Sequence, residues 1–179
     1  MTTEPTSGFR HFHDQLGTLK QRLLAMSARA EELVELSVDA LLTHDVGKAQ
    51  AVIEADRELD QQELEVEHLA VELLALQQPM ARDLRFLISA ITVTSDLERV
   101  GDHAVNIAQS VQRLHALPTR VTPEPSIAEM ARRARAMLAD ALDAFVRADG
   151  ALGREVCKRD DHVDALNDSH FRVMLTHMM

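Results

Sequence analysis

The segment VIEADRELD at residues 52–60 decides the fold, because it recurs in altered form as VCKRDDHVD at residues 156–164. Each copy starts with a valine and ends with an Asp-x-x-x-Asp pair, and the two copies lie 104 residues apart. The same shift aligns identical residues before them: Met26 with Met130, Arg29 with Arg133 and Asp45 with Asp149. General amphipathic likeness does not place both aspartates in one register, so we infer two copies of one helical unit.

Composition predicts an all-α protein. Aromatic residues make up only 3%, tyrosine and tryptophan are absent, and β-branched residues never alternate with polar ones as they do in strands. The apolar pattern and the breaks in it predict helices over 9–44, 48–77, 81–115 and 126–149, with a fifth from about 152. The first three are long and joined by short connections, which favours an antiparallel three-helix bundle.

A proline-rich stretch, LPTRVTPEPS at residues 117–126, divides the chain, because its three prolines cannot continue a helix. We therefore expect a first bundle with a short N-terminal arm over 1–117, a linker over 118–125, and two helices of a second three-helix bundle over 126–179. Ser126 and Glu129 have the spacing of a capping box at the start of the fourth helix. The third helix of the second copy would lie beyond residue 179, so we expect that this bundle is incomplete in a fragment, or completed by a partner chain.

Net charge and apolar run lengths narrow the class of protein. The formal charge is −10 and no lysine- or arginine-rich block is present, which argues against nucleic acid and favours divalent cations or basic protein surfaces as partners. The longest uncharged runs, such as 86–95, cover half of the roughly 20 residues that span a bilayer, so we expect no membrane insertion. One cysteine and no secretory signal predict a soluble, cytoplasmic protein.

Acidic residues form a stripe along the second predicted helix. Asp56, Asp60, Glu63 and Glu67 are spaced by four, three and four residues, which places them on one helical face with no basic residue among them. Like charges so placed repel by roughly 0.2–0.5 kcal/mol per pair. Either water screens the stripe or a cation binds it.

The third predicted helix carries a matching pair, Glu98 and Asp102, within DLERVGD at residues 96–102. Glu98 is seven residues from both Ile91 and Val105, on the line of an apolar face where an unpartnered carboxylate is costly. Two such pairs on neighbouring helices would form an oxygen-rich cage for a divalent cation. The candidate metal ligands are thus Asp56, Asp60, Glu98 and Asp102, with Asp160 and Asp164 in the second copy.

Other interpretations of these residues stay open. The acidic pairs could be solvated helix faces, and Glu98 could form an ordinary ion pair with Arg85 or Arg99. Glu65 and His68 form an E-x-x-H, which by itself favours a di-metal carboxylate enzyme or an iron-storage protein, although such sites need two copies. No phosphate-binding loop, nucleophile motif or H-E-x-x-H is present, so we expect no enzyme. A structural bundle that assembles with itself is a further alternative.

Three segments together resemble the PhoU family: VIEADRELD (52–60), QQPMARDLR (77–85) and DLERVGDHAVNIA (96–108). The resemblance implies tandem three-helix bundles in a cytoplasmic negative regulator of phosphate uptake and phosphate-regulon signalling. It implies contact with the ATPase of a phosphate ABC transporter and with a phosphate-sensing histidine kinase, and we expect a homodimer. It also implies binding of iron, zinc, magnesium or manganese by Glu98 and Asp102, faced by Asp56 and Asp60. Asp160 and Asp164 lack their expected partner helix.

Overall fold

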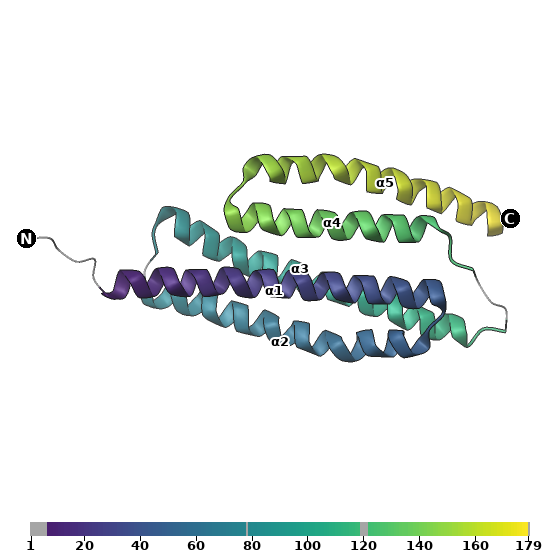
Figure 1. Ribbon diagram of the computed structural model, residues 1–179, viewed down its shortest axis with the longest axis horizontal. Coiled ribbons are helices and arrows are strands. Elements are labelled where there is room, and N and C mark those ends of the chain that lie inside the picture. The colour runs from purple at the N-terminus through teal and green to yellow at the C-terminus, as the bar shows by residue number, and fades with distance from the viewer. Residues whose placement is uncertain (1–6, 78, 119–121, 179) are drawn as a thin grey trace, which may run out of the picture.

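The computed structural model describes residues 7–77, 79–118 and 122–178. Within them it contains five α-helices and no strand: α1 (Ser7–Thr43), α2 (Val46–Gln77), α3 (Ala81–His115), α4 (Ser126–Arg147) and α5 (Gly150–Met178). The expected N-terminal arm at 1–6, positions 119–121 of the expected linker and the last residue lie outside the described residues. Figure 1 shows α1–α3 side by side, with α4 and α5 as a hairpin on one side of them. The all-α prediction is confirmed.

The core of the first bundle is a seam of leucines interleaved with small residues. On α3 every third or fourth residue is buried, and these residues are Leu87, Ala90, Thr94, Leu97, Gly101, Ala104, Ala108 and Val111. The hydroxyl of Thr94 donates a hydrogen bond of 2.8 Å to the carbonyl oxygen of Ala90, so this buried polar group is satisfied. Each fully buried leucine of this seam contributes about 1.5–3 kcal/mol relative to an exposed one.

The turns that follow α1 and α4 have the same structure, 104 residues apart. His44 and Ala148 adopt left-handed backbone, with φ of 56° and 57°. The next residue in each turn donates its backbone N–H to a carbonyl near the helix end, from Asp45 to Ala40 at 3.0 Å and from Asp149 to Ala144 at 2.8 Å. This 6→1 bond closes the C-terminus of each helix.

An aspartate then caps the helix that follows each turn. The Asp45 carboxylate accepts a 3.0 Å hydrogen bond from the backbone N–H of Lys48, and Asp149 accepts one of 3.0 Å from Leu152. The fourth helix was expected to run to residue 149 and the fifth to begin near 152, but α4 ends at Arg147 and α5 begins at Gly150. The left-handed residue and the capping aspartate, rather than the glycine, set these boundaries.

The predicted capping box at the start of α4 is wrong. The residue before the helix is Pro125, and no side chain caps the helix there. The hydroxyl of Ser126 instead lies 2.8 Å from Nδ1 of His170 on α5, which ties the two helices together. Glu129 accepts hydrogen bonds from Arg132 and Arg133, and these two partners hold its pKa at about 2.

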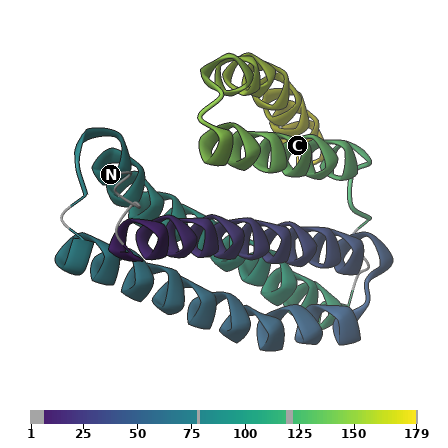
Figure 2. The same cartoon turned by 60° about the vertical axis from the view of Figure 1, so that its left-hand side comes forward.

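The hairpin of α4 and α5 rests on the first bundle through α4 alone. Arg135 on α4 forms an ion pair of 2.6 Å with Glu35 on α1, and the rings of Phe145 and Phe86 stack with their centroids 5.0 Å apart. Among the described helices α5 packs only against α4, where Arg159 pairs with Asp140 at 2.7 Å. Figure 2 shows α5 on the outside of this arrangement. The second unit therefore has two helices where the first has three.

Gly101 should tolerate no side chain, in contrast to Gly17. A Cβ at Gly101 would collide with the Leu59 side chain of α2 and lie 2.9 Å from Oδ1 of Asp56. Overpacking costs typically 1–3 kcal/mol, which exceeds the helix-propensity gain of about 1 kcal/mol for alanine. Gly101→Ala should therefore lower the free energy of unfolding in a urea titration.

Gly17→Ala is the matched control, because Gly17 lies inside α1 and a Cβ there meets nothing within 4 Å. It should raise the free energy of unfolding by about 0.5–1 kcal/mol through helix propensity alone. Equal effects of the two substitutions would contradict a close approach of α2 and α3 at Gly101.

Candidate functional site

Carboxylates from α2 and α3 gather beside Gly101, along the line where the two helices pack together. Because residue 101 has no side chain, Asp56 of α2 comes close to the backbone of α3. Asp60 and Glu63 follow Asp56 along α2, and Glu98 and Asp102 lie across from them on α3. The Glu98 carboxylate is close enough to Asp56, Asp60, Glu63 and Asp102 to feel the charge of each. We call these five residues the acidic groove.

Burial and mutual repulsion raise the pKa of three of these carboxyl groups. For Asp56 the larger cause of the raised pKa is partial burial, followed by the charges of Asp60 and Asp102. The pKa of Glu63 is raised by burial and then by Glu67, Asp60 and Asp102. For Glu98 burial again comes first, and Asp102 is the strongest of the four charges that raise its pKa further. All of these effects penalise the ionised form.

No basic side chain neutralises the acidic groove. Within the described part of the chain none of its five members forms an ion pair. Arg99 pairs with Asp96, at 3.5 Å, and not with Glu98. Arg85 forms no ion pair with Glu98 either. The alternative in which Glu98 is part of an ordinary ion pair is therefore wrong. The arginines of α1 instead pair with acids on the other side of α2, as Arg29 does with Glu58.

Ligand type and charge in the groove fit a divalent cation. The five donors are all carboxylate oxygens, which are the preferred ligands of magnesium and manganese, whereas zinc prefers imidazole and thiolate. As the side chains stand, no three acidic, histidine or cysteine groups among the described residues are close enough to hold one ion. Glu63 and Glu98 are half-buried and long, so a change of rotamer is the adjustment by which they could converge on a cation.

The remaining predicted ligands lie apart from this groove. Asp160 and Asp164 are exposed on α5, which packs only against α4 in the described part of the chain, so no counterpart of α3 faces them. Glu63, by contrast, belongs to the groove but was not among the predicted ligands. The four-three-four spacing of the acidic stripe was the signal that could have included it.

The E-x-x-H pair gives no support to a di-metal centre. Glu65 forms an ion pair of 3.5 Å with Arg22 of α1, so its carboxylate lies on the opposite side of α2 from the acidic groove. His68 is exposed on the same helix. The observation that favoured a di-metal enzyme is therefore an ordinary contact between α1 and α2.

Two repeated all-α units, with an acidic groove in the first, define the class as a tandem helical-bundle protein. A family model described as the PhoU domain matches residues 23–111 and 127–179, which cover both copies of the repeat. The chain belongs to the PhoU domain family. No helix in the described residues is long and apolar enough to cross a membrane.

Relatives of known name are similar over most of this chain. The phosphate-specific transport system accessory protein PhoU homolog of Clostridium acetobutylicum is 36% identical over 168 residues, which are 93% of this chain and 76% of that protein. The protein of the same name in Pseudomonas aeruginosa is 34% identical over 170 residues, covering 95% of this chain and 70% of the relative.

Solved structures agree with the fold. The crystal structure of PhoU from Pseudomonas aeruginosa superposes with a TM-score of 0.87 at 34% identity, over 94% of this chain and 80% of that one. The phosphate transport system regulatory protein PhoU from Streptococcus pneumoniae gives a TM-score of 0.85 at 29% identity, over 93% and 78% of the two chains.

Removing one charge from the acidic groove should stabilise the fold. Because the folded-state pKa of Glu98 is raised, the folded protein binds this proton more readily than the unfolded chain does. Stability therefore rises as the pH falls through the raised pKa towards the ordinary carboxyl value of about 4, and it is lowest above that window. Glu98→Gln should add roughly 0.5 kcal/mol at neutral pH and low salt, and less in high salt. Urea unfolding at neutral and acidic pH measures this.

Glu129→Gln should act in the opposite direction. Its pKa is lowered to about 2 by Arg132 and Arg133, so its ionised form stabilises the fold above the ordinary carboxyl pKa and loses that effect only as the pH falls towards 2. This variant should be less stable than the parent protein at neutral pH. If Glu98→Gln also lowers stability, as Glu129→Gln is expected to do, the carboxylates of the acidic groove do not repel one another without compensation.

Proposed function

We propose that this chain is a cytoplasmic accessory regulator of a phosphate-specific transport system, and that it restrains phosphate uptake and phosphate-regulon signalling by protein contact. The observation that carries the proposal is the similarity to accessory proteins of that name, at 36% identity over 93% of the chain. Its partners would be the ATPase of the phosphate transporter and a phosphate-sensing histidine kinase. The protein would act as a homodimer.

Metal binding would take place in the acidic groove. Asp56, Asp60, Glu98 and Asp102 would be the ligands, with Glu63 as a fifth donor that only the structure brings in. A bound divalent cation would supply the positive charge that the groove lacks. The support is the set of raised pKa values at Asp56, Glu63 and Glu98 together with the absence of a basic partner in the described residues. The second pair, Asp160 and Asp164, is not included, because no acidic helix faces it in the described part of the chain.

The groove would connect metal binding to partner contact through its charge. Asp60 and Asp102 are exposed, so a partner that packs across α2 and α3 meets their negative charge directly. The half-buried Asp56 and Glu98 lie behind them and add to the same field. Neutralising these carboxylates would favour partners with an apolar or acidic surface, whereas the uncompensated groove would favour a basic one.

Substitution in the groove should abolish metal binding. We expect the parent protein, purified without chelator or a metal-affinity tag, to contain a divalent metal in elemental analysis and to bind manganese in calorimetry. Asp56→Asn combined with Glu98→Gln should weaken that binding about tenfold or more, because two charged donors are lost.

Asp160→Asn combined with Asp164→Asn is the matched control, since it removes the same charge from an exposed pair with no facing helix. It should bind manganese as the parent protein does. If all three proteins bind manganese with equal affinity, the metal site lies outside the acidic groove. If none of them binds metal, the proposal of a metal site is wrong.

Regulation by contact is tested separately. The purified chain should be retained by the tagged transporter ATPase or by the cytosolic part of the sensor kinase from the same organism, and its expression should lower phosphate uptake in cells that lack their own copy. Failure to bind both partners would overturn the contact mechanism. A loss of binding confined to Asp56→Asn with Glu98→Gln would tie the contact to the acidic groove.

A further inference from the structure

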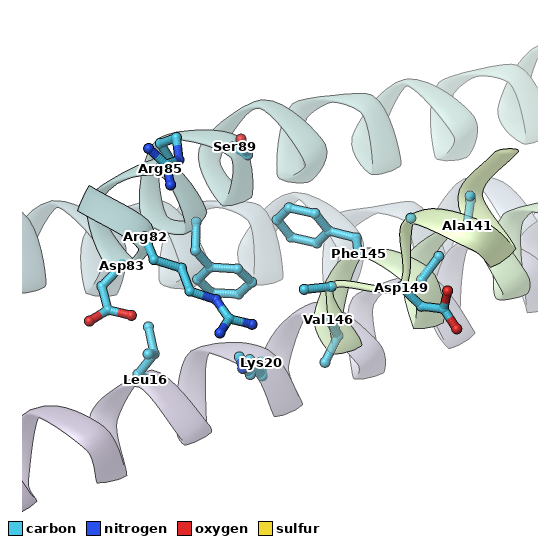
Figure 3. A pocket seen from close by; sticks show the side chains of 15 residues that line it. Leu16, Lys20, Arg82, Asp83, Arg85, Ser89, Ala141, Phe145, Val146 and Asp149 are labelled. Atoms are coloured by element: carbon cyan, nitrogen blue, oxygen red, sulfur yellow. The ribbon is translucent and has the colours of Figure 1, made fainter. Parts of the chain in front are cut away.

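A pocket of about 760 Å³ lies where α1 and α3 meet the turn between α4 and α5. It is separate from the acidic groove, and Figure 3 shows the side chains that line it. Its size is within the 300–1,000 Å³ typical of small-molecule sites. The walls come from both copies of the repeat, so a molecule bound here would touch the first bundle and the hairpin at once.

Cationic side chains without an acidic partner among the described residues gather at this pocket, although the whole chain carries a charge of −10. Lys20, Arg82 and Arg85 line it, and none of them forms an ion pair or side-chain hydrogen bond among the described residues. In Figure 3 the side chain of Arg82 reaches from α3 towards α1, the helix that carries Lys20. Cations from two different helices, neither of them paired with an acid, are suited to one anionic group.

The two carboxylates in the wall leave these cations uncompensated. Asp149 accepts hydrogen bonds of 3.0 Å from the backbone N–H groups of Ala151 and Leu152, so it is engaged in capping α5. Asp83 lines the pocket but forms no ion pair with Lys20 or Arg82 in the described part of the chain.

The rest of the wall is apolar and aromatic. Phe86 and Phe145 stack at 5.0 Å between centroids and 14° between planes, and the ammonium group of Lys20 lies 5.1 Å from the centroid of Phe86. On the α5 side the wall contains Gly150 and Gly153, which leave it without side chains. A Cβ at Gly153 would meet only the Cβ of Ala144, at 4.0 Å, so the space beside it is open.

We propose that this pocket binds a phosphorylated small molecule with a flat body, of the size and chemistry of a nucleotide. Arg82 and Lys20 hold the phosphate, since a guanidinium and an ammonium group are the usual protein ligands of phosphate oxygens. The flat body packs against the apolar part of the wall, in which Phe86 and Phe145 are already stacked on each other. This role accounts for Arg82 within the segment QQPMARDLR, which the acidic groove does not use, and it is independent of the proposed metal site.

Calorimetry of the full chain in the presence of EDTA, which removes divalent cations, tests the proposal with three probes. ATP should bind, whereas inorganic phosphate and adenosine should each bind at least tenfold more weakly, because each lacks half of the recognised chemistry. No binding of ATP would overturn the proposal. Binding of inorganic phosphate as tight as that of ATP would overturn the role of the aromatic wall.

Three variants locate the binding. Arg82→Gln should weaken ATP binding at least tenfold and reduce its dependence on salt. Gly153→Leu should also weaken it, by filling the pocket while all charges remain, and an unlowered melting temperature would show that its fold is intact. Arg172→Gln is the matched control, because Arg172 is exposed on α5 and outside the pocket wall. Unchanged binding in both pocket variants would overturn the site.

Discussion

The close approach of α2 and α3 at Gly101 is the constraint on which the rest of the first bundle depends. The missing side chain lets Leu59 pack into the seam and brings Asp56 against the backbone of α3. The same approach that buries apolar surface therefore forces carboxylates of two helices into one groove, where burial and mutual repulsion raise their pKa values. At this position the close packing stabilises the fold, whereas the repulsion between the carboxylates that it brings together destabilises it. The acidic groove therefore lies directly beside the buried Leu59.

Much of the fold was predictable because the repeat and the proline-rich stretch can both be recognised in the sequence itself. The predicted helix 81–115 coincides with α3. The turns were less predictable, since the left-handed residues are His44 and Ala148 rather than the neighbouring glycines. Neither histidine nor alanine usually indicates a left-handed turn in a sequence. The helix ends are therefore recognised only from the 6→1 hydrogen bonds of the structure. The capping box at Ser126 was predicted wrongly because the spacing of Ser126 and Glu129 does not show which residue precedes the helix.

The candidate site was predictable in part. Glu98 was recognisable because it lies on an apolar line, and the Asp56 pair because it recurs. Glu63 was missed, since its membership depends on the register between α2 and α3, which spacing within one helix does not give. The pocket could not be predicted from the sequence, for a related reason. Lys20, Arg82 and Phe145 come from three helices, and their meeting depends on how the hairpin sits on the bundle.

The two copies of the repeat have kept their turns but not their surroundings. Arg29 reaches from α1 to Glu58 of α2, whereas its counterpart Arg133 pairs with Glu129 on its own helix. In the described part of the chain α5 rests on α4 alone. Loss of the contacts that α4 makes with α1 and with Phe86 of α3 would therefore release both helices in a single opening, while α1–α3 stay closed. We therefore expect the amide hydrogens of the hairpin to exchange with solvent through one shared opening, as a cooperative unit less protected than α1–α3.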